Sequence, residues 1–120
     1  MPVSNNRKVG QYYEEKATEY LKQQGYIILK INFRCRVGEI DIIAKDGDYL
    51  VFLEVKYRKS GKKGDPSEAV NYYKQRTITK VAQYYMVKNN LSYNTSCRFD
   101  VIVILQNKIR LIKNAFNAII

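Results

Sequence analysis

The alternation of apolar and polar residues over residues 38–58 predicts two β-strands joined by a tight turn. The dipeptide Asp46-Gly47 separates the two runs, and both of its residues tolerate the positive φ angles that hairpin turns require. A loop of two or of four residues centred on this dipeptide leads to the same strand register. The predicted cross-strand pairs are Ala44 with Tyr49, Asp41 with Phe52 and Glu39 with Glu54.

Four charged residues of this hairpin fall on one face, because successive side chains of a strand alternate between faces. They are Glu39, Asp41, Glu54 and Lys56. In this register Asp41 and Glu54 are diagonal neighbours, roughly 7–8 Å apart, and can be bridged by one or two metal ions. A plain solvated face is the alternative, but Phe52 shares the face, and the apolar run 49–53 is typical of a central strand covered on both sides. We therefore favour a functional carboxylate cluster.

Two other stretches have the apolar spacing of amphipathic helices. The first covers residues 9–24, after a polar arm at residues 1–8, and Gly25 is placed to end it in a left-handed conformation. The second runs from residue 66 to about residue 89, and its capping residues are Asp65, Pro66 and Glu68. The predicted core residues of the helices are Tyr13, Ala17, Tyr20 and Leu21 in the first, and Val70, Tyr73, Thr77, Ile78, Val81, Ala82 and Tyr85 in the second.

Three further strands complete the predicted sheet. Residues 26–33 precede the hairpin, residues 97–105 form a nearly continuous apolar strand, and residues 108–113 form a short edge strand. The long helix before residues 97–105 is a crossover connection, so this strand should lie parallel to the second hairpin strand. The order α-β-β-β-α-β-β predicts a single α/β domain over residues 1–120, with a mixed sheet flanked by helices.

The excess of basic over acidic residues indicates a polyanionic partner. Lysine and arginine number 21 against 11 acidic residues, which gives a net charge of +10. Such a balance favours nucleic acid, because binding to phosphates releases condensed counterions. A basic protein without such a partner remains the alternative. The chain has no apolar signal segment and no run of transmembrane length, so we expect a cytoplasmic protein without a membrane partner.

The chain offers no residues for a zinc site or for histidine acid–base chemistry. It contains no histidine, and its two cysteines, Cys35 and Cys97, are far apart in the sequence. A metal ion would have to be held by carboxylate and carbonyl oxygens. Such ligands suit a hard ion such as Mg²⁺ or Mn²⁺.

The spacing of Asp41 and Glu54-Val55-Lys56 has the D-x(n)-E-x-K form of the PD-(D/E)XK nucleases, and the layout resembles the archaeal Holliday junction resolvases. Nearly the whole chain resembles the YraN family of small bacterial proteins, which are nuclease-like by fold. The matching segments are Gly10, Glu14, Ala17, Tyr20-Leu21, Gly25, Asn32-Phe33-Arg34, G-E-I-D-I-I-A, F-L-E-V-K-Y-R, E-A-V with Lys74, and Arg98-Phe99-Asp100-Val101. Tyr13 stands where the family commonly has glycine, and its ring is expected to crowd the approach to Glu14.

The resemblance implies a restriction-endonuclease-like fold and a metal-dependent endonuclease that hydrolyses phosphodiesters of DNA, including branched or junction DNA. It implies that Asp41 and Glu54 hold the ion with the carbonyl of Val55, and that Lys56 orients water or stabilises charge on the phosphate. Because Lys56 lies among carboxylates, we favour charge stabilisation by a protonated lysine. Glu14 and Glu39 are the less certain ligands: Glu14 adjoins the apolar stripe of its helix, and Glu39 could bind a second ion or only tune the first.

Basic residues near the acidic face are the expected contacts for a phosphate backbone, either as phosphate ligands or as countercharges of the carboxylates. They are Arg34, Arg36, Arg58, Lys59, Lys62, Lys63 and Lys74. Phe99 and Asp100 are interpreted as structural, with Asp100 pairing with Arg98 or a loop arginine. Tyrosines occur in three doublets, at residues 12–13, 72–73 and 84–85, each with one core member. The other member is interpreted as a surface tyrosine, with stacking on unpaired bases as the alternative.

Two other functions stay open on the sequence. One is a nucleic-acid-binding module that keeps a nuclease fold with little or no catalysis. The other is an interaction protein whose acidic face meets a basic partner. The apolar segment 114–120 either packs on the core or contacts a second subunit, so a homodimer is also open.

Overall fold

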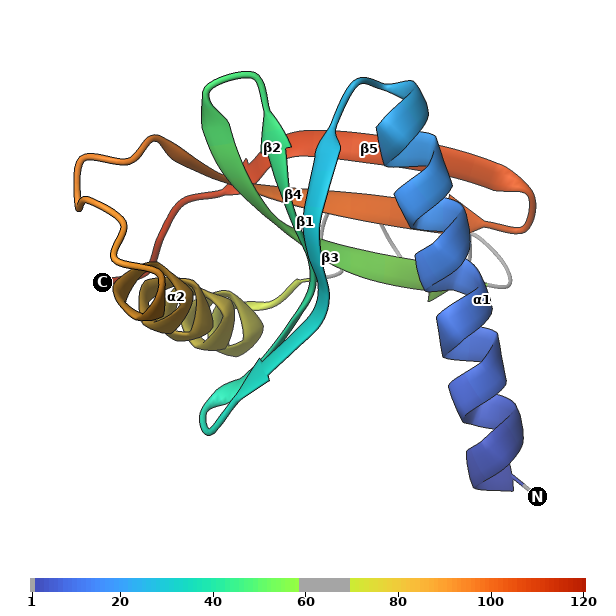
Figure 1. Ribbon diagram of the computed structural model, residues 1–120. Helices are drawn as coiled ribbons and strands as arrows, with labels where there is room; N and C mark the ends of the chain where they lie inside the picture. The colour runs from blue at the N-terminus through green and yellow to red at the C-terminus, as the bar shows by residue number, and fades with distance from the viewer. Residues whose placement is uncertain (1, 59–69) are drawn as a thin grey trace.

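A computed structural model of the protein describes residues 2–58 and 70–120. Five strands form one mixed sheet, with helix α1 packed on one face and helix α2 on the other (Figure 1). The elements are α1 (Pro2–Gln23), β1 (Ile27–Cys35), β2 (Gly38–Asp46), β3 (Tyr49–Arg58), α2 (Tyr72–Lys88), β4 (Cys97–Leu105) and β5 (Lys108–Phe116). This confirms the predicted α-β-β-β-α-β-β order and the restriction-endonuclease-like arrangement of a mixed sheet flanked by helices.

Strand β3 is the central strand of the sheet, as its apolar run predicts. The sheet order is β1-β2-β3-β4-β5, and β3 pairs antiparallel with β2 and parallel with β4. The parallel pair confirms the predicted crossover through α2. Edge strand β5 continues to Phe116, three residues beyond its predicted end, because Phe116 stacks on Phe99 of β4 with ring centroids 5.0 Å apart.

The hairpin between β2 and β3 forms, but its predicted register is wrong by two residues. Asp46 pairs with Tyr49, so the two loop residues are Gly47 and Asp48, and Gly47 adopts a φ of 59° at the first loop position. The predicted pairs Ala44–Tyr49, Asp41–Phe52 and Glu39–Glu54 are therefore not formed. The structure pairs Ala44 with Val51, Ile43 with Phe52 and Ile42 with Leu53. Continued by one position, this register places Asp41 directly opposite Glu54.

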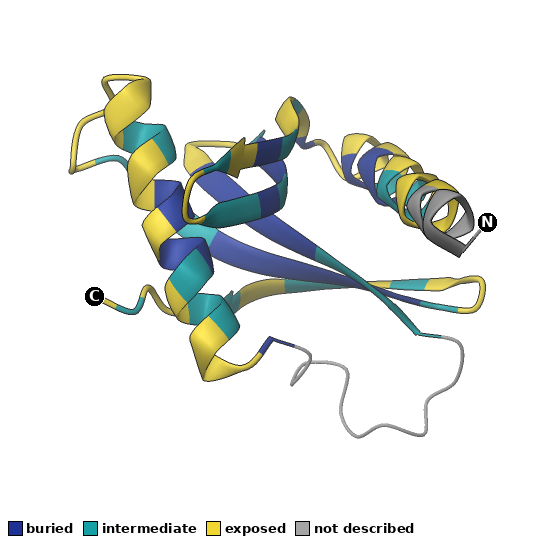
Figure 2. Ribbon diagram, turned by 90° about the horizontal axis from the view of Figure 1, so that it is seen from below, coloured by how far each residue is buried: buried dark blue, intermediate teal, exposed yellow. Residues whose placement is uncertain are grey.

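Apolar side chains cover both faces of the central strands. Figure 2 shows these strands coloured largely as buried. On the α1 face, the core includes Ala17, Leu21, Ile42, Leu53 and Ile102. On the α2 face, it includes Phe33, Phe52, Ile78, Val81 and Phe99. Burial on both faces explains why residues 50–53 show no polar alternation. It also means that a charged residue in the middle of these strands must find a partner inside the protein.

Helix α1 is longer than the sequence pattern predicts. It begins at Pro2, so the expected polar arm over residues 1–8 is wrong. Proline suits the first turn of a helix, where its missing N–H needs no partner, but the polar residues that follow have no apolar period to reveal the helix. The other end is as predicted: Gly25 has a φ of 92°, and the N–H of Tyr26 donates to the carbonyl of Leu21 at 2.9 Å.

Helix α2 begins later than predicted. Its N-cap is Asn71, whose side chain accepts a hydrogen bond of 2.9 Å from the N–H of Lys74. The predicted start at residue 66 is therefore wrong, because residues 70 and 71 are not helical and Asn71 supplies the cap. The predicted capping residues Asp65, Pro66 and Glu68 lie outside the described residues. Neither described helix is long and apolar enough to span a lipid bilayer.

The exposure of the tyrosine doublets departs from the prediction at one position. Tyr73 was expected in the core, but its side chain is 76% exposed, and Tyr72 beside it is exposed as well. Tyr73 belongs to the first turn of α2, whereas the buried residues of this helix begin at Ile78. In the other doublets Tyr13 and Tyr85 pack against the core, as predicted.

A buried polar network joins Tyr26 just before β1, the end of β2 and the start of β4. Asp100 is fully buried and accepts hydrogen bonds from Arg98, from the hydroxyl of Tyr26 at 2.9 Å and from the N–H of Asn114 at 2.9 Å. Arg98 also pairs with Asp46 at 2.7 Å. The arginine holds the pKa of Asp46 below its ordinary value. The pairing of Arg98 with Asp100 confirms the structural interpretation of Asp100.

Candidate functional site

Asp41 and Glu54 form a carboxylate pair where β2 and β3 begin to separate. The paired ladder of these strands ends at Ile42 and Leu53, one residue before the two acids meet. Asp41 accepts a hydrogen bond of 2.8 Å from the N–H of Val55. Burial raises the pKa of Asp41 to about 8, and the hydrogen bond to Glu54 and its negative charge add to this rise. Without a cation, the pair therefore retains a proton near neutral pH.

Glu54 is buried, with 6% of its surface exposed, and is incompletely paired. Its nearest cation is Lys74 of α2, whose Nζ lies 3.5 Å from Oε2. The two atoms form an ion pair without hydrogen-bond geometry, so Oε2 makes no hydrogen bond within the described part of the chain. Lys74 is therefore a countercharge of the acidic face, one of the two roles that the sequence left open for it. A buried carboxylate oxygen without a hydrogen bond is unfavourable unless a cation completes its surroundings.

Glu14 approaches the pair from helix α1. Its carboxylate accepts a hydrogen bond of 3.0 Å from the side chain of Asn32, which has a φ of 55° in the middle of β1. Burial raises the pKa of Glu14, and the negative charges of Asp41 and Glu39 also raise it. The hydrogen bond from Asn32 lowers the pKa of Glu14 and so opposes these effects. Asparagine tolerates this left-handed conformation better than most residues. Glu14 is therefore directed toward the sheet, and Asn32, which the sequence identified only within a matching segment, is what holds it.

Tyr13 does not crowd Glu14 as expected. Its ring stacks on Tyr57 of β3, with centroids 3.9 Å apart, while Glu14 bonds to β1. The two neighbouring side chains diverge because consecutive helical residues point about 100° apart.

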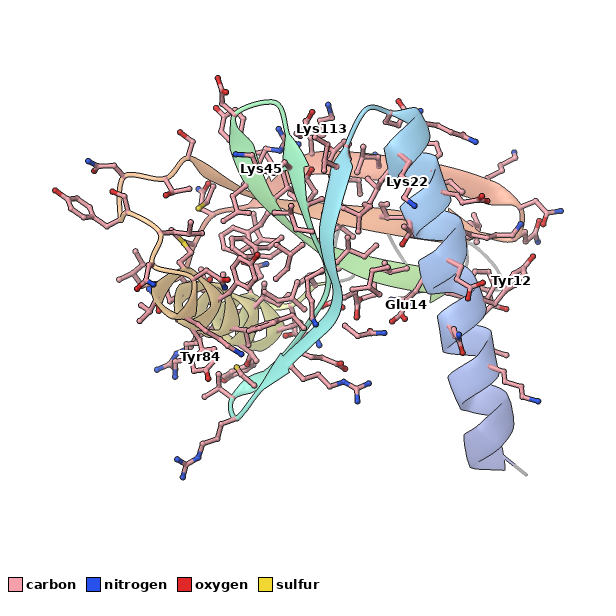
Figure 3. All side chains as sticks on the ribbon, viewed as in Figure 1. Tyr12, Glu14, Lys22, Lys45, Tyr84 and Lys113 are labelled. Atoms are coloured by element: carbon pink, nitrogen blue, oxygen red, sulfur yellow. The ribbon has the colours of Figure 1, made fainter. Side chains whose placement is uncertain are left out.

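Glu39 lies on the rim of the site. Its carboxylate pairs with Arg34 at 3.0 Å, and both side chains are well exposed. Together with Glu14 and Asn32, they line a groove of about 800 Å³ between α1 and β1 (Figure 3, where Glu14 is labelled). The groove opens Glu14 and Glu39 to solvent along one side of α1, whereas neither Asp41 nor Glu54 is among its lining residues.

The predicted ligands do not all converge. Within residues 2–58 and 70–120, no three Asp, Glu, Cys or His side chains are grouped as a metal site. The structure brings Asp41 and Glu54 together, directs Glu14 toward them and holds Glu39 on Arg34. Val55 contributes its backbone N–H to Asp41 here, and its carbonyl remains a predicted ligand. Two carboxylates nevertheless fit a magnesium site, since this ion is often held by one or two carboxylates, waters and substrate phosphates.

Lys56 follows Glu54 by two residues on β3 and is therefore on the same face of the strand. Its side chain is half-buried, and no ion pair joins it to any residue that the structure describes. Lys56 thus combines partial burial with a free charge beside the carboxylates. A phosphate group is the kind of ligand that would use such a lysine.

The predicted phosphate contacts have different surroundings. Arg36 is exposed on the β1–β2 turn, while Arg34 is exposed but paired with Glu39. Arg58 is half-buried and donates to the carbonyl of Tyr57 at 3.2 Å, and Lys74 is paired with Glu54. The predicted contacts Lys59, Lys62 and Lys63 lie outside the described residues. Of the described basic residues in this set, Lys74 is the one with an ion pair to the Asp41–Glu54 pair.

Comparison with known proteins gives the family. Residues 13–104 match the "Uncharacterised protein family UPF0102". A UPF0102 protein of Lachnoclostridium phytofermentans is 56% identical over 114 residues, which cover 94% of this chain and 97% of the relative. UPF0102 proteins of Caldicellulosiruptor saccharolyticus and Clostridium botulinum are 50% and 49% identical, over 93% and 92% of this chain and 99% and 95% of their own. The chain therefore belongs to the UPF0102 family, which is the YraN family that its sequence motifs indicated.

Proposed function

We propose that this protein is a Mg²⁺- or Mn²⁺-dependent endonuclease that hydrolyses phosphodiesters in DNA, with branched or junction DNA as the substrate class. The observation that carries the proposal is the Asp41–Glu54 pair. A buried Glu54 and a half-buried Asp41 lie opposite each other, one oxygen of Glu54 makes no hydrogen bond to a described residue, and the pKa of Asp41 is raised to about 8. Such an arrangement lowers the stability of the protein near neutral pH, which is typical of functional sites.

Asp41 and Glu54 would hold the ion, with the carbonyl of Val55 as the third protein ligand. Glu14 would become a ligand of the same ion if its hydrogen bond to Asn32 were broken. A divalent ion bound there would lower the pKa of a water molecule and offset negative charge on the phosphate, which supplies a nucleophile without histidine. The N–H of Val55 fixes the orientation of the Asp41 carboxylate, so the site is partly preorganised.

Lys56 would stabilise charge on the scissile phosphate. We favour electrostatic stabilisation over proton abstraction, because a positioned cation stabilises the negative charge that develops on the phosphate. Lys74 would leave Glu54 when the ion binds, because the two cations compete for the same oxygen. The freed ammonium of Lys74 would then be available to a neighbouring phosphate.

The net charge of +10 supports DNA as the substrate, and the exposed Arg34 lines the groove between α1 and β1. The alternative function is a nucleic-acid-binding module with little or no catalysis. The same basic surface supports this alternative. The retained Asp41, Glu54 and Lys56 favour the enzyme, because a site without catalysis would gain stability by losing the buried carboxylate pair.

The test is cleavage of labelled four-way junction, flap and linear duplex DNA with Mn²⁺ or Mg²⁺. We expect metal-dependent cuts in the junction or flap, and loss of at least about 10²-fold in rate for Lys56→Met, because a positioned cation contributes this much to phosphoryl transfer. Lys108→Met, an exposed lysine on β5, is the matched control and should cut normally. Binding of the substrates without any cleavage by the wild type would contradict the enzyme and favour the binding module.

A further inference from the structure

The outward face of helix α2 is unlike the rest of the helix surface. Its four residues Tyr73, Arg76, Lys80 and Tyr84 are all exposed and are separated by three, four and four positions, which places them on one face. Figure 3 labels Tyr84 on α2. We call this the Tyr73–Tyr84 face. None of its side chains takes part in the Asp41–Glu54 pair.

The charge of α2 has a single sign. The helix carries Lys74, Arg76, Lys80 and Lys88 and contains no acidic residue. Arg76 and Lys80 of the Tyr73–Tyr84 face form no ion pair with a described residue. A helix surface of this kind repels other basic surfaces and attracts a polyanion, because nothing on the helix neutralises it.

The two tyrosine rings of the face are large, exposed and partly held in place. Tyr73 is 76% exposed and packs edge-on against Tyr72, with ring centroids 5.7 Å apart. Tyr84 is 48% exposed and lies 6.2 Å from the ring of the buried Phe33. Rings held in this way lose little conformational freedom when a flat group stacks on them.

We propose that the Tyr73–Tyr84 face binds single-stranded DNA, with the bases stacking on Tyr73 and Tyr84 and the phosphates contacting Arg76 and Lys80. Alternating aromatic and basic side chains are how proteins hold unpaired strands, because every base presents a π face and every phosphate a charge. A duplex hides its base faces, so the rings would add little to duplex binding. From Tyr73 to Tyr84 the face covers about 16 Å of helix.

The proposal concerns a surface separate from hydrolysis, although the two adjoin. Tyr73 is followed in the chain by Lys74, which contacts Glu54. A strand held along α2 would therefore lead toward the carboxylate pair, as an unpaired arm of a flap or an opened junction would. Because stacking needs no metal, binding can be measured in a chelator, and failure of cleavage leaves this inference intact.

The experiment measures the binding of fluorescently labelled DNA by anisotropy, in the presence of EDTA. The DNA is about 20 nucleotides long, which exceeds one binding site, and is used both as a single strand and as the annealed duplex. Tyr73→Ala/Tyr84→Ala should lower the single-strand affinity by about tenfold or more and change duplex affinity little. Tyr73→Phe/Tyr84→Phe keeps the rings and should bind as the wild type does. Thermal melting by circular dichroism checks that each variant is folded.

Charge is tested separately from stacking. Arg76→Ala/Lys80→Ala should reduce the slope of log K against log salt concentration by about 1.4 for the single strand, since two phosphate contacts are lost. Lys108→Ala/Arg110→Ala on β5 removes the same charge elsewhere and should leave the slope unchanged. The proposal is overturned if the double alanine variant of the tyrosines binds normally, if it loses duplex and single-strand binding equally, or if an RNA strand is strongly preferred.

Discussion

Glu54→Gln should abolish metal-dependent cleavage, with a loss of about 10²-fold or more, and should at the same time stabilise the fold in EDTA. Cleavage is lost because the amide is a poor ligand for a hard cation. Stability rises because glutamine removes a buried charge beside Asp41 and can donate a hydrogen bond to it. We expect a gain on the order of 1–2 kcal/mol at pH 8, measured by urea unfolding.

The gain should depend on pH in a defined direction. In the wild type, the pKa of Asp41 is raised to about 8, above its ordinary value. A raised pKa in the folded state contributes stability at low pH that is lost as the pH rises through about 8. Glu54→Gln removes part of this rise, so its advantage should be small at pH 4 and grow toward pH 8.

Glu19→Gln, an exposed glutamate of α1, is the matched control and should change neither property. A variant that is inactive and also destabilised at pH 8 would contradict this account. It would mean that Glu54 is a structural residue whose charge is fully compensated in the native protein. An active Glu54→Gln variant would contradict the proposed site directly.

Arg98→Met should destabilise the protein by about 3–5 kcal/mol, because it leaves the fully buried carboxylate of Asp100 without its cation. Arg98 donates to Asp100, to Asp46 and to the hydroxyl of Tyr26, so it joins the first strand to the hairpin and to β4. Urea unfolding at pH 7 measures the loss. Any cleavage activity should be retained below the melting temperature, since no hydrogen bond or ion pair within the described part of the chain joins Arg98 or Asp100 to Asp41 or Glu54.

The double variant Arg98→Met/Asp100→Asn separates the arginine's packing from the isolated charge. Removing the unpaired carboxylate should recover roughly half of the lost stability, so the two substitutions should not be additive. Arg110→Met, an exposed arginine on β5, should shift stability by less than about 0.5 kcal/mol. A loss below about 1 kcal/mol for Arg98→Met would show that the network is solvated rather than buried.

The strands were predictable because their signals are local. The apolar run at residues 50–53 is buried on both faces, as its lack of alternation indicated. The register was not predictable from the same signal. Moving the turn from Asp46-Gly47 to Gly47-Asp48 keeps every side chain on its expected face, because it shifts the pairing by two residues. Only the detailed turn geometry distinguishes the two registers.

In the candidate site, too, local features were predictable from the sequence and long-range contacts were not. The shared face of Asp41 and Glu54 followed from alternation, but their direct opposition followed from the register. Asn32, Tyr26 and Asp46 act through partners that are 18, 72 and 52 residues away in the chain, so no local pattern could assign their roles. The start of α2 was missed because Asn71 and Asp65 are both good N-cap residues, and only tertiary structure selects between them.

The central claim is that the Asp41–Glu54 pair is a divalent-cation site, and titration calorimetry of Mn²⁺ into the protein tests it most directly. At pH 7 a carboxyl with a pKa of about 8 is mostly protonated, so binding should release nearly one proton, measured as heat that changes with the buffer. Asp41→Asn should bind more weakly and release no proton. The absence of saturable Mn²⁺ binding to the wild type, or equal binding and proton release by Asp41→Asn, would contradict the claim.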